Sequence, residues 1–209
     1  MGQQSPKGSP APRSLKQDRA GQTRLQLLDA TVECLTQVGY ARTTTTLVQK
    51  RAGVSRGALL YHFPSKAALL VEAVRHLVHL TGQHMKDQVD ALPAQDGDRI
   101  EKVLELLWET FSGPLFYVAM ELWNASRTDP KLWQVLVEAE RSLGREIHSQ
   151  ISDVFGPQVS SRPGFKRALR MTLQWMRGAA MTEIIRKDPE KAGAELKRWR
   201  EIFINLLED

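Results

Sequence analysis

The chain has 209 residues, 42% of them hydrophobic, and a formal net charge of +5 at pH 7. This length suits one large domain or a small domain joined to a larger one. No apolar stretch approaches the roughly 20 residues that span a bilayer, and the N-terminus lacks the apolar core of a secretory signal, so we expect a cytoplasmic protein without a membrane partner.

The positive charge is concentrated in the first part of the chain. Residues 1–80 hold 11 Lys and Arg against 4 Asp and Glu, whereas residues 81–209 hold 18 against 20. A basic segment joined to a nearly neutral one indicates that the first part meets a polyanion and that the second part has another task. A basic tail that is simply solvated is the alternative.

The chain opens with a segment of low apolar content. Residues 1–22 are rich in Pro, Gly, Ser and Gln, and we expect a disordered basic arm there. Apolar residues three and four apart then predict a helix from Thr23 to Val38, which ends at Gly39. The single cysteine, Cys34, cannot form an internal disulfide, and we interpret it as a buried packing residue rather than a redox or catalytic group.

A second, shorter helix is predicted after the run of four threonines at 43–46. A threonine hydroxyl can accept a hydrogen bond from a free N–H group in the first turn of a helix. Thr46 and Gln49 fit a capping box, although the helix could start two residues earlier. The helix runs to about Ala52 and ends at Gly53, a residue that can take the left-handed conformation.

A third helix is predicted directly after this turn. Ser55 is its N-cap, it runs from Arg56 to about Phe63, and Pro64 prevents a simple continuation. Leu59 and Phe63 give it an apolar edge with a spacing of four residues. A helix, a short turn containing glycine and a second helix form the helix-turn-helix motif.

The opposite edge of the third helix has the composition of a DNA-reading surface. Arg56, Gly57 and Ala58 stand at its start, where small residues allow close approach and an arginine can reach a guanine edge. Tyr61 and His62 can donate hydrogen bonds to phosphate oxygens, which fixes register rather than sequence. Such patterns also arise by chance.

Residues 24–74 resemble the N-terminal domain of the TetR family of bacterial transcription regulators. The matching features are Gly39-Tyr40, Thr43-Thr44, the turn Ala52-Gly53-Val54-Ser55 and the segment His62-Phe63-Pro64-Ser65-Lys66. The resemblance implies that Thr44, Tyr61, His62 and Lys66 contact phosphates and that Arg56, Gly57 and Ala58 lie over base edges. Two positions depart from the family pattern: Leu60 stands where a tyrosine is common, and Gln49 stands where alanine is usual.

The rest of the chain reads as a helical module without strand-like alternation. Ser65 caps a helix with an apolar stripe towards Met85, and residues 91–99 read as a loop. Helices are then predicted over 100–112, 115–126, 130–155, 165–185 and 189–207, with a loop at 156–164. We therefore predict an all-α protein with a three-helix DNA-binding domain at 23–68 and a helical effector-binding and dimerisation domain at 69–209.

The second module is rich in aromatic residues, most of which must be core. An aromatic cavity with a few polar groups is nevertheless the usual form of a small-molecule site, and TetR-like proteins bind effectors in this domain. The candidate effector residues are Trp108, Phe111, Phe116, Tyr117, Met120, Trp123 and Trp175, with Glu121, Asn124 or Arg127 near the mouth.

The last two predicted helices contain small residues, including Gly178. Small residues within a helix favour the close approach of another helix. In the TetR family these helices form a four-helix dimer interface. The residues that could supply it here are Leu169, Leu173, Gly178, Met181, Ile184, Trp199, Phe203 and Leu206. Packing within one chain is the alternative.

Rival functions have weaker support. The chain has no Gly-rich phosphate loop or paired cysteines, and the scattered Ser142, His148 and Asp153 lack the context of a nucleophile, so we expect no enzyme and no cofactor. His76, His79 and His84 read as surface histidines rather than a metal site. We predict a ligand-responsive dimeric regulator of the TetR type, a repressor that binds a palindromic operator on double-stranded DNA; a regulator without a ligand is the nearest alternative.

Overall fold

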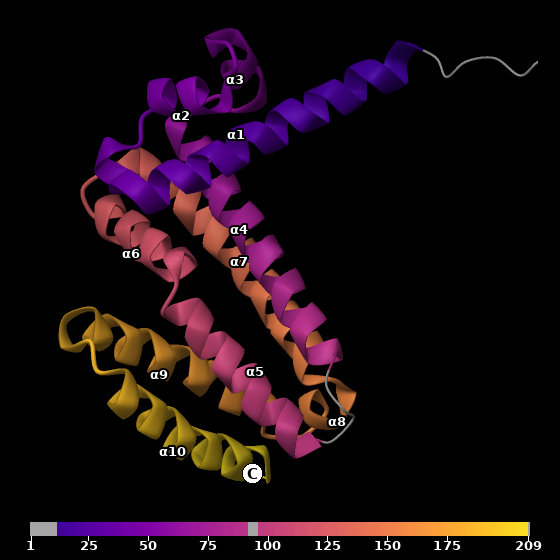
Figure 1. Cartoon of the computed structure of the whole chain (residues 1–209), viewed down its shortest axis with the longest axis vertical. Coiled ribbons are helices and arrows are strands. Elements are labelled where there is room, and N and C mark those ends of the chain that lie inside the picture. The colour runs from indigo at the N-terminus through magenta and orange to yellow at the C-terminus, as the bar shows by residue number, and fades with distance from the viewer. Residues whose placement is uncertain (1–11, 92–95, 209) are drawn as a thin grey trace, which may run out of the picture. The chain divides into compact units, whose positions relative to one another are not determined.

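The computed structural model describes the chain from residue 12 to 91 and from 96 to 208 (Figure 1). All regular structure within these ranges is helical, which confirms the predicted all-α class. The chain forms two compact units, Met1–Ala73 and Val74–Asp209. In the described part of the chain, no helix combines the length and apolarity needed to cross a membrane.

The first unit is built from α1 (Pro12–Arg42), α2 (Thr45–Ala52), α3 (Arg56–His62) and the first turns of α4 (Lys66–Asp90). Each helix is too short or too polar to be stable alone, and each contributes apolar residues to one shared core. The core residues are Leu27, Leu28, Ala30, Cys34, Val48, Leu59, Phe63, Leu69 and Ala73. The apolar edge predicted for the third helix is therefore buried.

Helix α1 begins earlier than the sequence predicts. It starts at Pro12, so residues 12–22 are helical where we expected part of a disordered arm. Proline is favoured at the first helical position. Because the packed part of α1 is already helical, the helix can be extended towards the N-terminus without a new nucleation step. Residues 1–11 of the expected arm lie outside the described residues. At the other end, Gly39 has φ 76° and interrupts the helix where the sequence predicts its end.

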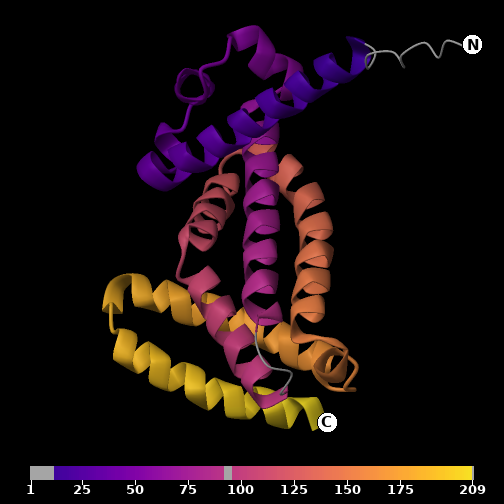
Figure 2. The same ribbon diagram turned by 45° about the vertical axis from the view of Figure 1, so that its right-hand side comes forward.

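The second unit continues α4 and adds six helices within the described residues. These are α5 (Asp96–Phe111), α6 (Pro114–Ser126), α7 (Pro130–Phe155), α8 (Pro157–Ser160), α9 (Phe165–Arg186) and α10 (Pro189–Glu208). Helices α9 and α10 form an antiparallel pair, and α5 packs on both (Figures 1 and 2). The core at this crossing includes Leu104, Phe155, Phe165, Leu169, Met176 and Phe203.

Two predicted loops contain helix. Helix α5 starts at Asp96, inside the predicted loop 91–99, and the short helix α8 lies inside the predicted loop 156–164. Four residues cannot form a stable helix alone. Helix α8 is held because Val159 is fully buried in the core of the unit, a contact that local sequence patterns do not reveal.

The start of α9 approaches the end of α10 very closely. A Cβ atom added to Gly164 would lie 1.8 Å from the carbonyl oxygen of Leu206. No other residue fits there without moving the backbone of α10. Gly164 is thus required by packing between these two helices.

Candidate nucleic-acid interface

Helix α2 is capped by Thr44. The Oγ1 atom of Thr44 accepts a hydrogen bond from the N–H group of Leu47 at 3.1 Å. This places the start of α2 two residues before the capping box at Thr46 and Gln49, which is therefore not the cap. The neighbouring hydroxyl of Thr43 is not available, because Thr43 is 1% exposed and donates to the carbonyl oxygen of Gly39 at 2.7 Å.

The turn between α2 and α3 has the predicted chemistry. Gly53 takes the left-handed conformation, with φ 67°, and ends α2. Ser55 then caps α3, since its Oγ atom accepts from the N–H group of Ala58 at 3.2 Å. Leu59 and Phe63 are buried on the inner side of the seven-residue α3. One edge of the helix is thus locked inward, so the opposite edge is held outward.

The outward edge of α3 contains the residues predicted to meet DNA. Arg56 and Gly57 are exposed, and Tyr61 is 80% exposed. Ala58 and His62 are half-buried at the border of the edge, and the rings of Tyr61 and His62 meet edge to face at 5.0 Å. These five residues lie along the leading side of one short helix, and Gly57 leaves the backbone open to close approach.

The two departures from the family pattern have defined positions. Leu60 is 49% exposed beside the more exposed Tyr61, so Tyr61 is the ring that α3 presents to solvent. Gln49 is half-buried in α2, and its carbonyl oxygen accepts from the N–H group of Val54 at 3.1 Å. The longer Gln49 side chain is accommodated without loss of the turn.

Lys66, expected to contact phosphate, has a contact inside its own unit. Its Nζ atom donates to the carbonyl oxygen of Tyr40 at 3.4 Å and lies 4.5 Å from the centroid of the Tyr40 ring. The side chain is half-buried at the start of α4, which Ser65 caps through the N–H group of Ala68. Thr44, the other predicted phosphate contact outside α3, is exposed at the start of α2.

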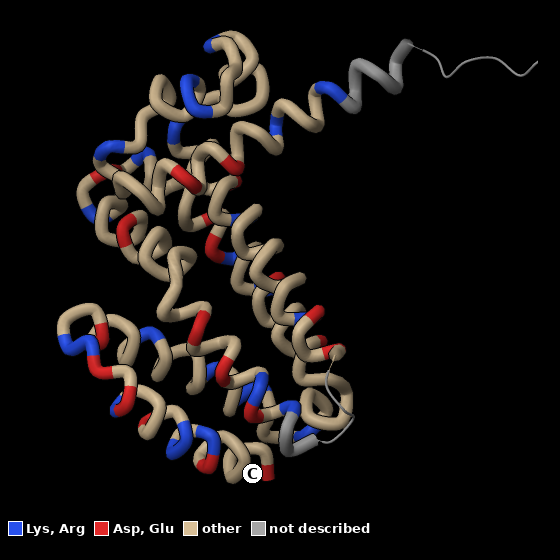
Figure 3. Tube along the Cα trace, viewed as in Figure 1, with Lys and Arg blue, Asp and Glu red and all other residues tan. Residues whose placement is uncertain are grey.

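The charge around the helix-turn-helix is of one sign. No Asp or Glu occurs between Glu33 and Glu72, whereas this stretch contains Arg42, Lys50, Arg51, Arg56 and Lys66. Both flanking carboxylates are paired: Glu33 lies 3.8 Å from Arg51, and Glu72 lies 2.5 Å from Arg24. Figure 3 shows blue positions and no red ones along α2 and α3. A surface of this kind attracts a polyanion such as a nucleic acid.

Cys34 belongs to the core beneath this surface. It is fully buried, and burial raises the pKa of its thiol, while Arg51 lowers that pKa and Glu33 raises it. A neutral buried thiol is a poor nucleophile. The prediction of a packing residue agrees with this position.

The predicted effector residues form two aromatic groups in the second unit. In the first, the Trp108 and Trp175 rings lie 6.0 Å apart, and Trp175 stacks in parallel on Trp199 at 4.8 Å. In the second, the Phe111 and Phe116 rings lie 5.3 Å apart.

The other three predicted effector residues lie on α6 beside the second group. Tyr117 lies next to Phe116, with ring centroids 6.3 Å apart, and is 40% exposed; Met120 and Trp123 are half-buried.

An open hollow of about 670 Å³ lies at the junction of α6 and α7. Its lining is formed by Ser126, Arg127, Pro130 and Trp133, and Trp133 is 54% exposed. The sequence predicts Arg127 near the mouth of a cavity, whereas Ser126, Pro130 and Trp133 are not among the predicted effector residues. The available sequence signal was a tryptophan in the first turns of the helix, four residues after the N-cap Asp129.

The residues predicted for a dimer interface divide into buried, half-buried and exposed sets. Leu169, Leu173 and Phe203 are buried in the core of the single chain, so they are not free to contact a partner. Trp199 and Leu206 are half-buried, and Trp199 donates through Nε1 to Thr172 at 3.0 Å. The exposed members are Gly178, Met181 and Ile184. Met171, Ile185 and Ile202 are further exposed apolar residues of α9 and α10 that we had not named.

The histidines of α4 do not form a metal centre. Within the described ranges, no group of three or more His, Cys, Asp or Glu side chains has the arrangement to hold a metal ion. His84 instead contacts the side chain of Gln88 at 2.7 Å. His79 and His84 are exposed, whereas His76 is half-buried.

Comparison with known proteins identifies the first unit. Residues 27–73 match the family described as bacterial regulatory proteins, tetR family. An uncharacterized HTH-type transcriptional regulator of Mycobacterium tuberculosis is 28% identical over 175 residues, which cover 84% of this chain and 89% of that protein. The matched residues contain the whole helix-turn-helix described above.

Solved structures share the fold of the whole chain. A TetR transcription regulator from Haloarcula marismortui has a TM-score of 0.65 and 18% identity, with 90% of this chain and 97% of that chain covered. FadR from Bacillus subtilis, solved in complex with stearoyl-CoA, has a TM-score of 0.57 and 18% identity, with 88% and 97% covered. At these identities the likeness establishes the fold. The family match over residues 27–73 and the transcriptional regulators among the relatives support a TetR-family transcription regulator.

Proposed function

We propose that this regulator is a homodimeric repressor that binds a palindromic operator and is released from it by a small hydrophobic or amphipathic effector. The observation that carries the proposal is the outward edge of α3. Its exposed Arg56, Gly57 and Tyr61 lie on a helix whose other edge is buried, within a stretch free of acidic residues.

The residues of this edge have distinct tasks in the proposal. The guanidinium of Arg56 reads a guanine edge in the major groove, and Gly57 and Ala58 let the backbone approach the bases. Tyr61 and His62 donate to phosphate oxygens and fix the register of the helix.

Two further phosphate contacts come from outside α3. Thr44, exposed at the N-cap of α2, lies where a helix N-terminus favours an anion. The ammonium of Lys66, which contacts the carbonyl of Tyr40 at the start of α4, brings a positive charge next to the helix-turn-helix and is the second proposed phosphate contact.

The dimer is proposed to form through the outward sides of α9 and α10. Met181 and Ile185 are 54% and 86% exposed, and Gly178 between Met171 and Met181 has no atom within 4 Å of where a Cβ would be. Exposed apolar residues on one helix side around an open glycine favour the close approach of another helix. A two-fold dimer presents two copies of α3, spaced for half-sites about 34 Å or a multiple of that distance apart.

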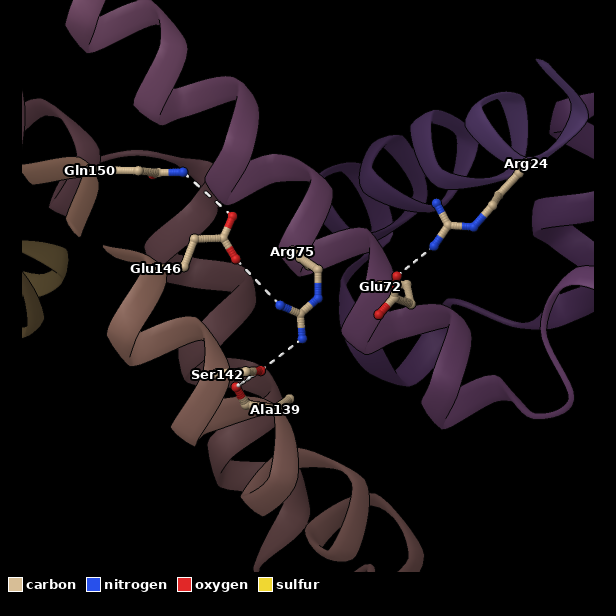
Figure 4. A network of polar contacts seen from close by, with 7 residues as sticks. All are labelled: Arg24, Glu72, Arg75, Ala139, Ser142, Glu146 and Gln150. Carbon is tan, nitrogen blue, oxygen red and sulfur yellow. Dashed lines mark hydrogen bonds and ion pairs between the residues drawn. The ribbon is translucent and has the colours of Figure 1, made fainter. Parts of the chain in front are cut away.

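Release by an effector requires a link between the two units, and α4 supplies one because it is continuous through Ala73 and Val74. Within the second unit, Arg75 holds α4 to α7: its Nη2 atom donates to Ser142 at 2.9 Å and its Nη1 atom to Glu146 at 3.3 Å (Figure 4). Within the first unit, Glu72 accepts from Arg24 of α1. A ligand that moves α7 or α4 thus acts on the helix that leads to α3. This changes DNA binding only if the ligand binds one arrangement of α4 and α7 more tightly than another.

The decisive experiment is selection of bound fragments from a random pool of duplex DNA. An enriched inverted repeat with a fixed spacing is the expected result, since two symmetric copies of α3 read it. Enrichment of a single unrepeated site contradicts the proposed dimeric reading, and the absence of any enriched duplex at low salt contradicts specific DNA binding as a whole. Thermal denaturation of the protein against a panel of hydrophobic metabolites then tests for an effector, because a bound ligand stabilises the folded state.

A further inference from the structure

Arg177 of α9 is a half-buried cation whose donors are incompletely used. Its Nε atom is buried and has no hydrogen-bond partner among the described residues. Arg200 has the same unpartnered Nε atom, but its Nη1 atom pairs with Glu101 at 3.0 Å, and Arg75 pairs with Glu146 at 3.3 Å. An unsatisfied buried donor on a charged group is costly, and in a native fold it calls for an explanation.

The contact that Arg177 does make leaves its donors free. Its Cζ atom lies 5.5 Å from the centroid of the Trp123 ring of α6. A cation over an aromatic ring is attracted by the ring electrons, but it uses none of the five N–H donors of the guanidinium. The indole itself is held in place, since its Nε1 atom donates to Glu140 of α7 at 2.7 Å. Three helices thus position one cation and one oriented aromatic face.

An apolar strip leads away from this cation along α6. Phe116, Met120 and Trp123 follow one another at spacings of four and three residues, so they share one side of the helix. Phe116 is 4% exposed and packs on Phe111 of α5, whereas Met120 and Trp123 are only half-buried. The strip therefore runs from a buried aromatic pair to a free guanidinium.

We propose that Arg177 binds the anionic head group of the effector and that the effector is an amphipathic monoanion, such as a carboxylate with an unbranched apolar chain. The guanidinium matches a carboxylate in a two-bond fork, and the apolar chain lies along the half-buried Met120, towards the buried Phe116. The inference rests on the proposed function, because it names the ligand class of the effector site. The inference excludes a cationic effector, because the positive charge of Arg177 would repel a cation bound beside Trp123.

The test compares three probes of equal chain length: decanoate, decanol and decyltrimethylammonium, below their micelle concentrations. Isothermal titration calorimetry of the full-length protein measures their affinities. We expect decanoate to bind at least about tenfold more tightly than the other two, as charge-assisted hydrogen bonds at a partly buried site warrant. In Arg177→Met, which keeps the stem on Trp123, decanoate affinity falls about tenfold or more and decanol affinity changes less than about twofold.

Two further variants and one parallel assay make the result decisive. Arg186→Met is the control, because it removes an exposed arginine from the last turn of the same helix; it should leave all affinities unchanged. Arg177→Lys keeps the charge and should recover part of the decanoate affinity that Arg177→Met loses.

Equal binding of decanoate and decanol, preference for the ammonium probe, or no binding of any probe overturns the inference. A further outcome also overturns the inference: Arg177→Met changes the dimer dissociation constant but leaves decanoate binding unchanged. Arg177 would then pair with a carboxylate of the second chain of the dimer rather than with an effector. Operator binding without any probe is measured alongside; its absence contradicts the proposed function, while its presence without decanoate binding contradicts only the inference.

Discussion

At the residue scale, the side chains proposed to contact DNA differ in what they can recognise. Arg56 is exposed at the first helical position, where a planar fork of donors can match a guanine edge. Lys66 is half-buried at the start of α4 and already bound to Tyr40, so it can supply only a point charge. Base recognition and charge neutralisation are therefore expected from different residues.

Replacing Arg56 with alanine is expected to relax base preference at one position of each half-site. The loss corresponds to about 1–3 kcal/mol of discrimination between bases. Competition binding against operators with a substitution at each position measures it. Arg56→Lys is the matched variant, because it keeps the charge and loses the fork; full retention of base preference in Arg56→Lys would argue against a bidentate contact.

Replacing Lys66 with alanine is expected to weaken binding to specific and random duplexes alike. One fewer phosphate contact reduces the slope of log affinity against log salt by about one unit. Fluorescence anisotropy at several salt concentrations gives this slope, and Lys66→Arg should keep it. If Lys66→Ala lowers affinity with an unchanged slope, its role is to hold the Tyr40 carbonyl rather than to contact DNA.

At the element scale, α4 is anchored on each side of the point where the two units divide. Glu72 binds Arg24 of α1, and three residues later Arg75 binds Ser142 and Glu146 of α7 (Figure 4). Further along, Gly82 of α4 permits the approach of Gln150, whose side chain would lie 2.3 Å from an added Cβ. The setting of α4 against α7 thus depends on side chains from both helices.

Arg75→Met is expected to loosen the setting of α4 rather than to reduce DNA contacts. Wild-type protein should show a sharp optimum in affinity across operators whose half-site spacing varies in steps of one base pair. Arg75→Met should show a shallow optimum with an unchanged salt slope, because Arg75 neutralises no phosphate in the proposed complex.

The control for the Arg75 variant is Arg145→Met, an exposed arginine of α7. It should keep the sharp spacing optimum. The Arg75–Glu146 contact itself should contribute about 0.2–1 kcal/mol to stability in a double-mutant cycle, since both side chains are about one third exposed. A uniform loss of affinity at every spacing in Arg75→Met would indicate general destabilisation and contradict the positioning role.

At the scale of the whole molecule, recognition of a palindrome depends on association of two chains. Met181, Ile185 and Ile202 are exposed on α9 and α10, whereas Leu169 and Phe203 are buried in the core of the single chain. An exposed apolar surface of this kind is typical of a protein interface.

Met181→Lys is expected to raise the dimer dissociation constant by about 100-fold, because a symmetric interface loses two apolar side chains and gains two charges. Sedimentation equilibrium measures the change, and operator affinity should fall with it. Leu80→Lys is the control, since Leu80 of α4 is 45% exposed and lies outside α9 and α10. Equal effects of the two variants, or none, would count against the proposed interface.

The sequence by itself determined the all-α class, most of the helices and the helix-turn-helix, but not the short helix α8. Ser55, Gly53 and the apolar pair Leu59 and Phe63 act within a few residues of one another, so their spacing is enough to predict the outward edge of α3. The departure at Thr44 is a two-residue shift of a helix end, where several threonines can serve as the cap.

Only the tertiary structure decided which apolar and charged residues remain available. Periodicity marks Leu169 and Met181 alike as apolar residues of one helix, but the packing of α5 and α10 buries the first and leaves the second exposed. Likewise, nothing local distinguishes the paired Arg75 from the incompletely satisfied Arg177. Their partners lie in other helices, and burial and pairing depend on contacts between segments far apart in the chain.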